Sequence, residues 1–304
     1  MRSITASGLA DLSKTLSGSH YIHCSYGPKY EIVLLSRNKP HWLDPERRTY
    51  SLPPFLYRIQ CLHPTGWEVA LELASTWKSY DFAQPLPGRR WLLVDSRLAA
   101  DRAPNADIFD EDGTLLSSIV AGDGIQHVQA TSAGDIWIGY FDEGVYAGGK
   151  LEGSGLVCLT EEGQPRLQYW IDVGEPNALP CIDDCYALNV SGEEEVWTSY
   201  YSNFPLVRLR RKSLDKAWLD FPAIAVRAFA VNGDRLLMTP AYRREGPLYS
   251  VNLQNSSVEE IQVVGPRGQP LYFDHSFGRG PLLCFASVSD APNQALFAVD
   301  LRSI

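Results

Sequence analysis

The sequence feature that most constrains the fold is a strand–turn–strand pattern that recurs along the chain. Its clearest copy lies between Gly124 and Val145, where two apolar runs, 125–130 and 136–140, flank the turn Ser132–Asp135. The first run alternates apolar and polar residues and the second is β-branched and aromatic, which is typical of paired antiparallel strands. Glycine and aspartate in the turn suit a tight hairpin. With two further strands expected at 155–159 and 167–171, this unit forms a four-stranded sheet.

Five other segments repeat this pattern of an alternating strand, a turn and an apolar strand. The sixth unit has only three strands before the chain ends at Ile304, and the segment before Tyr21 has no partner of its own, so an N-terminal strand is expected to complete the last sheet. Six units in 304 residues give about 50 residues each, within the range of propeller repeats. The paired runs are 21–26 with 30–36, 80–86 with 90–95, 184–190 with 195–200, 226–231 with 235–239, and 273–277 with 282–288.

The predicted fold is therefore all-β: a six-bladed β-propeller of four-stranded antiparallel blades, a single domain over residues 1–304. A seven-bladed ring and a β-sandwich are the alternatives. A sandwich does not account for the recurring Gly-Asp-hydrophobic-Trp corner. A closed ring also protects strand edges that a long flat sheet would leave exposed.

Two stretches resemble the repeats of two-component-regulator propellers, whose units carry a Gly-Asn/Asp-hydrophobic-Trp-hydrophobic-Gly core. These stretches are SAGDIWIGYFDEGV (132–145) and GLVCLTEEGQ (155–164), and SGEEEVWTSY (191–200) is a looser match. The resemblance implies a propeller of a kind used mainly for sensing and interaction. A fold resemblance does not by itself fix a function.

The charge balance argues against a nucleic-acid partner. The formal net charge is −9, from 36 acidic and 27 basic side chains, whereas phosphate backbones are bound by clustered Lys and Arg. The one basic run, Arg208–Lys212, is expected to form a hairpin tip. No apolar run reaches the roughly 20 residues of a membrane span, and the first residues lack the apolar core of a signal peptide. We therefore expect no membrane partner, a cytoplasmic location and six reduced cysteines.

Candidate functional residues are expected where the innermost strands begin, around the central channel. Aligning the six units on their turns places His23, Asp81, His127, Cys185, Arg227 and His275 in register, and three of the six histidines of the chain fall in this set. The glycine-rich segment 141–149 is expected to form a loop at the rim of a ligand site. The neighbouring candidates are Tyr80, Asp123, Gln126, Asp184 and Asp274.

Two functions fit these residues. The first is a binding module that takes a small ligand or a protein partner at the channel mouth. The second is a hydrolase- or lyase-like enzyme with His127 and His275 as general bases and Arg227 holding an anionic group, or with Cys185 as a nucleophile beside His127. No cofactor is predicted. A divalent metal, if one is used, would take its ligands from His23, His127, His275 and Asp81.

Overall fold

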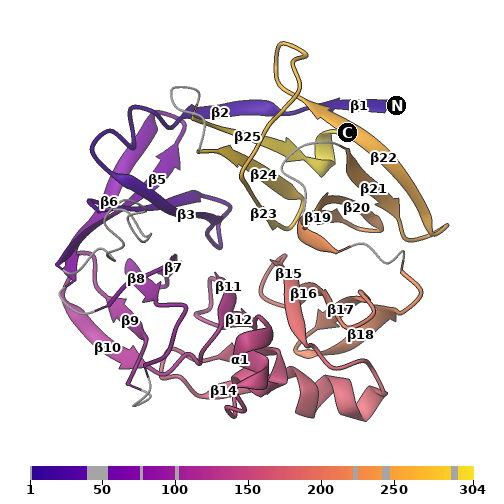
Figure 1. The fold of residues 1–304 in the computed structure, drawn as a ribbon, viewed down its shortest axis with the longest axis horizontal. Coiled ribbons are helices and arrows are strands. Elements are labelled where there is room, and N and C mark those ends of the chain that lie inside the picture. Colours follow the sequence, from indigo (N-terminus) through magenta and orange to yellow (C-terminus); the bar gives the residue numbers. More distant parts are fainter. Residues whose placement is uncertain are drawn as a thin grey trace, which may run out of the picture.

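A computed structural model shows a ring of six blades, each built on a four-stranded antiparallel sheet (Figure 1). It describes residues 2–39, 54–75, 78–99, 103–221, 225–241, 247–288 and 294–304. The predicted six-bladed propeller is confirmed. The long loop expected between Arg37 and Pro54 lies almost wholly outside the described residues.

Each blade runs from the centre of the ring outward in chain order. The innermost strands are β3 (His20–Tyr26), β7 (Phe82–Leu86), β11 (Ile125–Ala130), β15 (Asp184–Val190), β19 (Val226–Asn232) and β23 (His275–Arg279). The second strands are β4 (Ile32–Arg37), β8 (Arg90–Val94), β12 (Ile136–Tyr140), β16 (Glu195–Tyr201), β20 (Arg235–Pro240) and β24 (Leu282–Ser287). The third strands are β5 (Phe55–His63), β9 (Ala106–Phe109), β13 (Leu156–Leu159), β17 (Leu206–Arg210), β21 (Leu248–Asn252) and β25 (Ala295–Asp300). The outer strands of blades one to five are β6 (Gly66–Ser75), β10 (Leu115–Ile119), β14 (Pro165–Gln168), β18 (Ser213–Trp218) and β22 (Ser257–Val264).

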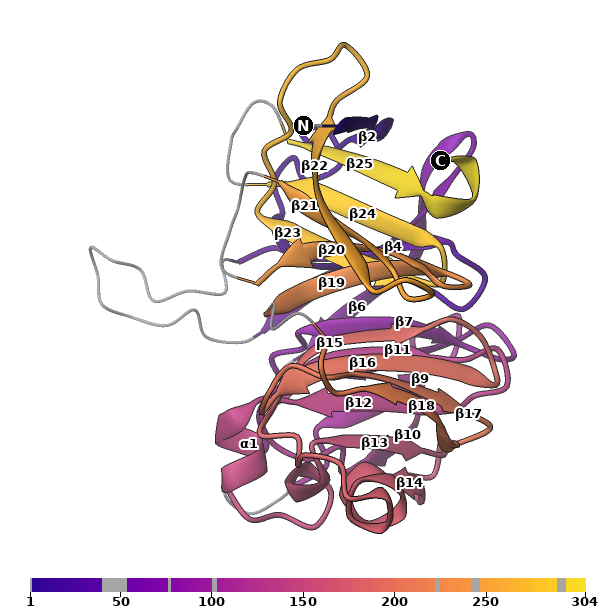
Figure 2. The ribbon, with the colours of Figure 1, turned by 90° about the vertical axis from the view of Figure 1, so that its right-hand side faces the viewer.

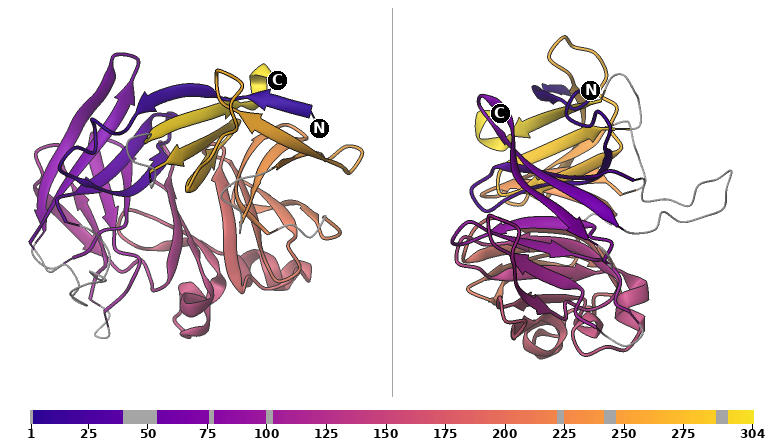
Figure 3. Two further views of the ribbon diagram at one scale, coloured as in Figure 1. Left: turned by 45° about the horizontal axis from the view of Figure 1, so that its top comes forward. Right: turned by 90° about the vertical axis from the view of Figure 1, so that its left-hand side faces the viewer.

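The N-terminal segment closes the ring, as the three-stranded sixth unit predicts. Strand β2 (Ser7–Asp11) pairs antiparallel with β25 and becomes the outer strand of blade six. Strand β1 (Arg2–Thr5), which the sequence did not indicate, pairs parallel with β22 and adds a fifth strand to blade five. Both termini therefore lie at blades five and six (Figures 1 and 3).

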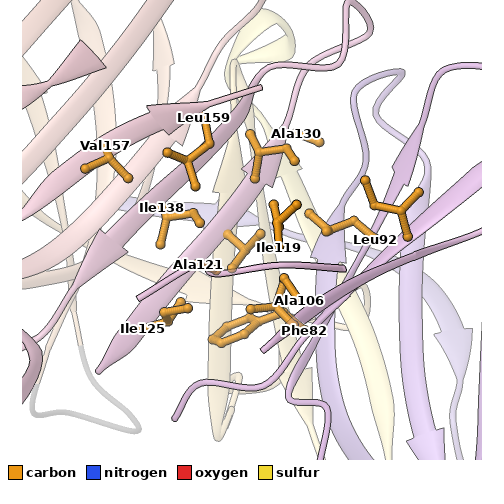
Figure 4. Close-up of a cluster of buried hydrophobic side chains, with 14 of the residues drawn as sticks. Phe82, Leu92, Ala106, Ile119, Ala121, Ile125, Ala130, Ile138, Val157 and Leu159 are labelled. Atoms are coloured by element: carbon orange, nitrogen blue, oxygen red, sulfur yellow. The ribbon is translucent and has the colours of Figure 1, made fainter. Parts of the chain in front are cut away.

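The hydrophobic core is divided among the six interfaces between neighbouring blades. One buried cluster fills each interface; the cluster between blades two and three includes Phe82, Leu92, Ile138 and Val157 (Figure 4). Because the second strand of each blade packs against neighbouring blades on both faces, these strands are largely buried: β12 and β4 have no exposed residue. The ring thus holds its inner strands in fixed positions around the channel.

Two local expectations were wrong. The strand expected at 167–171 ends at Gln168, and the chain continues as a π-helix (Trp170–Gly174) followed by a 3₁₀ turn (Glu175–Asn177). Apolar Trp170 and Ile171 look like strand residues, but Ile171 is exposed. The outer strand expected at 217–221 is instead Ser213–Trp218. The reason is that the hairpin turns tightly at Arg211 and Lys212, which both adopt positive φ.

Two segments that looked like loops are ordered differently. The glycine-rich segment 141–149 contains a short helix, α1 (Asp142–Tyr146), that projects from one rim of the ring (Figure 2). The expected turn at 278–280 is mostly strand, because β23 continues to Arg279 before the chain turns. The basic run does form a hairpin tip, where Arg211 pairs with Glu194 and Lys212 with Asp135. No helix in the described part of the chain has the length and apolar character needed to cross a membrane.

Candidate binding site in the central channel

A cavity of about 980 Å³ opens at the rim where the innermost strands begin. Its walls come mainly from the first residues of β3, β7, β11, β19 and β23. The segment that links β2 to β3 adds Leu16 and Ser19, and Phe141 adds an aromatic ring beside α1. Seven of the predicted residues line it: His23, Asp81, Gln126, His127, Arg227, Asp274 and His275.

β-Bulges at the start of the inner strands determine which side chains reach this cavity. The pairing register shifts between Tyr21 and His23, between Ile125 and His127, and between Val226 and Ala228. A bulge places two residues opposite one and re-aims the side chains that follow. Four of the six blades share this irregularity at the inner strand, and strand patterns alone do not reveal it.

Three imidazoles from three blades meet in the cavity. Burial lowers the pKa of His23 to about 3, with smaller contributions from the nearby rings of His275 and His127, while Asp81 acts in the opposite direction. Burial likewise lowers the pKa of His127 to about 4. Both rings are therefore neutral at pH 7, and each offers one hydrogen-bond donor and one acceptor.

Aromatic contacts fix two of these imidazoles. The ring of His23 meets Phe82 edge to face at 4.9 Å between centroids. The ring of His275 stacks on Tyr21 at 5.0 Å, with 26° between the planes. The phenyl groups of Phe82 and Phe277 also line the cavity, so its wall combines apolar rings with polar groups.

The charged side chains of the cavity hold the chain's own backbone. The guanidinium of Arg227 donates to the carbonyl oxygens of Asp274 (3.0 Å) and Ala241 (2.8 Å). The carboxylate of Asp81 accepts from the backbone N–H (2.9 Å) and hydroxyl (2.5 Å) of Ser96. The carboxylate of Asp274 accepts from the N–H of Val288 (2.8 Å). Arg227 thus joins blades five and six, and its predicted role in holding an anionic group stays a prediction.

Four predicted residues lie outside the cavity lining. Tyr80 is buried between blades one and two, where its hydroxyl donates to Asp107. Asp123 accepts from the N–H of Leu98 at 2.8 Å and pairs with Arg97, which holds the β8–β9 loop. Asp184 lies near Asp142, and burial together with that second carboxylate raises its pKa to about 6.

Cys185 is the fourth. Its Sγ atom lies in the core between blades three and four, 3.6 Å from Oγ1 of Thr198. Burial raises the pKa of this thiol to about 12, so it remains protonated at neutral pH. A reactive cysteine needs the opposite environment, exposed and with a lowered pKa.

Two amide side chains close the channel at the floor of the cavity: Gln129, which is partly buried and lines the cavity, and Asn189, which is fully buried. Gln129 donates to the carbonyl oxygens of Leu188 and Gly278, both at 3.1 Å, and accepts from the N–H of Val190 at 2.8 Å. Asn189 donates to the carbonyl oxygen of Phe229 (2.7 Å) and accepts from the N–H of Gly280 (2.7 Å). These bonds link blades three, four, five and six, and the next residues along the strands, such as Ala130, are fully buried. The cavity is therefore a pocket open at one rim.

Sequence reasoning missed several lining residues, including Phe82, Gln129, Phe141 and Phe277. The apolar ones look like ordinary strand residues, and Gln129 lies deeper along β11 than the aligned positions. Among the described residues, no three His, Cys, Asp or Glu side chains are placed so that they could hold a metal ion.

Comparison with known proteins supports the fold and little more. The model of the YxzG family matches residues 157–291, less than half of the chain. No curated protein matches. Two solved structures of Hsv2 from Kluyveromyces lactis are similar, each at 9% sequence identity. One, in which loop 6CD is replaced by a Gly-Ser linker, has a TM-score of 0.52 over 88% of this chain and 75% of its own. The other, with the complete loop, has a TM-score of 0.50 over 93% and 74%. The resemblance to two-component-regulator repeats is not confirmed.

Proposed function

We propose that this protein is a binding module that takes a small organic molecule into the channel cavity. The observation that carries the proposal is the convergence of His23, His127 and His275, from three blades, in one pocket of about 980 Å³. Ligand pockets are typically of this size and combine apolar walls with a few converging polar groups. Because the pocket is open at one rim only, it suits a compact ligand better than a protein segment.

The imidazoles favour binding over catalysis. A general base works best when its pKa lies near the working pH, but the pKa of His23 is about 3 and that of His127 about 4. Such rings are weak bases at neutral pH, yet they remain good hydrogen-bond partners. The resemblance of residues 132–145 to sensor-type propeller repeats is consistent with this choice.

A ligand screen with a blocked cavity tests the proposal. Nucleosides, sugars, amino acids and small carboxylic acids would be screened for binding by saturation-transfer NMR. The variant Gln126→Trp fills the cavity mouth, since Gln126 is an exposed lining residue. Gln164→Trp is the matched control, in the exposed turn between β13 and β14. A true ligand should bind the wild type and the control but not Gln126→Trp.

Two outcomes would contradict the proposal. One is that every compound that binds also binds Gln126→Trp with the same affinity. The other is that the wild type converts a bound compound to a product and the His127→Gln variant does not. That result would indicate that the same cavity is an active site. Replacing His23 or His127 separately then shows which imidazoles contact the ligand.

A further inference from the structure

Arg279 lies at the closed end of the channel, just beneath the cavity floor. It is the last residue of β23 and is 1% exposed. Of its two neighbours, Gly278 accepts the hydrogen bond from Gln129 and Gly280 donates its N–H to Asn189, as described above. The side chain of Arg279 itself crosses the ring, because Nη2 donates to the carbonyl oxygen of Ala130 in blade three at 2.7 Å. A guanidinium is thus enclosed where strands of four blades meet.

This guanidinium lacks the partners that a buried cation requires. Its Nη1 atom is buried and has no hydrogen-bond partner, and no carboxylate of the described residues forms an ion pair with it. Arg37, the other fully buried arginine in the described part of the chain, shows the contrast. Arg37 donates to Lys39, Tyr57 and Ser79 and lies over the ring of Phe55 at 4.3 Å. The same chain therefore satisfies one buried guanidinium with its own groups and leaves the other incomplete.

The nearest acidic side chains are engaged elsewhere. The carboxylate of Glu193 accepts from the N–H groups of Ser132 (2.7 Å) and Ala133 (3.2 Å). The carboxylate of Glu31 accepts from the N–H of Lys29 at 2.8 Å. Burial lowers the pKa of Arg279 to about 10, and the charges of Glu31, Tyr30 and Glu193 oppose that shift only in part. The group therefore stays protonated at neutral pH.

We propose that a small inorganic anion of the size of chloride binds at the closed end of the channel, against Nη1 of Arg279. Burying a charge without a partner is costly, and an unpaired buried polar atom in a native protein usually marks a bound water or ion. A single negative charge at Nη1 supplies both the hydrogen-bond acceptor and the counter-charge. Because the side chain is 1% exposed, an anion enclosed beside it has to be small. This site is separate from the ligand cavity and does not depend on its proposed function.

Thermal unfolding in two salts tests the proposal. Sodium chloride would replace sodium gluconate at constant ionic strength, since gluconate is too large for the site. A ligand that binds only the folded state raises the unfolding midpoint in a saturable way, and we expect a rise of about 2–5 °C. Arg279→Met should lose this rise. Arg37→Met, the matched control, should keep it, although its own midpoint is lower. An equal rise in Arg279→Met and the wild type would reveal a general salt effect and overturn the proposal.

Crystals of the wild type grown in bromide give a second test that does not require any variant to fold. An anomalous peak is expected at hydrogen-bond distance from Nη1 of Arg279. Ordinary electron density at that position without an anomalous signal would identify an ordered water, and the proposed anion site would be wrong. An empty site would overturn the proposal equally.

Discussion

The Nε2 atom of His127 lies 3.1 Å from the carbonyl oxygen of Tyr186, which belongs to the next blade. A carbonyl oxygen only accepts, so Nε2 carries the hydrogen and Nδ1 of the neutral ring is the acceptor. The orientation of a cavity imidazole is thus determined by the spacing of blades three and four. Any change that shifts these blades should also change the cavity.

The first prediction concerns acid sensitivity, because the pKa of His127 is about 4 in the folded protein and near 6.5 when the ring is in water. Between these values the unfolded chain binds more protons, so the free energy of unfolding falls as the pH drops from 6.5 toward 4. His127→Gln should remove about 2 kcal/mol of this fall. Urea unfolding at several pH values would measure it.

Leu188→Ala serves as the control for this experiment. It also removes a cavity-lining side chain but has no titrating group, so it should lower stability by a similar amount at every pH. If His127→Gln and the wild type lose stability in parallel between pH 6.5 and 4, the ring of His127 does not carry the predicted shift.

The candidate site was predictable in part. The β-bulges explain why some of the predicted residues do not reach the cavity. The aligned strand starts indicated His23, His127 and His275, which the structure places in the cavity lining. In blade four, however, the register shifts between Asp184 and Ala187, so Cys185 is turned into the core. A single-residue change of register reverses the face of a side chain, and nothing in the local sequence marks where it occurs.

The fold was predictable because each blade repeats the same strand and turn signals. The missing strand of the sixth unit even indicated ring closure by β2. By contrast, the parallel pairing of β1 depends on an edge of β22 that only the assembled ring presents. Arg279 was assigned to a turn because glycines flank it, whereas those glycines serve close packing across the ring.

A second prediction concerns Asp184, whose ionised form destabilises the folded state. Burial and the nearby charge of Asp142 raise its pKa to about 6 from 3.8, so the ionised form is a cost to the folded state above pH 6. Asp184→Asn should therefore stabilise the protein at pH 8 by about 1 kcal/mol, after allowance for partial exposure. As the pH falls through 6 toward 4 the folded carboxyl takes up its proton, and the gain should disappear.

The adjacent Asp183 is a matched control for that variant. Burial opposes ionisation there too, but hydrogen bonds from Ser202 and Tyr146 leave its pKa lowered. Asp183→Asn should consequently destabilise the protein at pH 8. Denaturation of both variants at pH 8 and pH 4 should give opposite signs at the higher pH. The same sign for both would mean that the Asp142–Asp184 repulsion is not significant.

A third prediction tests the closure of the ring. Deleting residues 1–5 removes β1 and the buried side chain of Ile4, which should cost about 2–4 kcal/mol but leave β2 in blade six. Deleting residues 1–11 also removes β2 and exposes the edge of β25. That protein should unfold at a much lower urea concentration, or aggregate through the exposed edge. Equal stability of the two truncated proteins would show that the pairing of β2 with β25 contributes little.

The last prediction tests the close packing of β19 against β23 at the closed end of the channel. A Cβ atom on Gly278 would lie 2.0 Å from the carbonyl oxygen of Phe229, a backbone atom that cannot move independently. Gly278→Ala should therefore force the two strands apart and destabilise the protein by about 3 kcal/mol or more. Gly192→Ala is the control, because its Cβ would meet no atom within 4 Å and stability should change by less than about 0.5 kcal/mol. Urea unfolding measures both, and a mild effect at Gly278 would mean that the inner strands do not approach as closely as described. Since Gly278 also accepts the hydrogen bond from Gln129, the same variant should weaken ligand binding in the cavity above it.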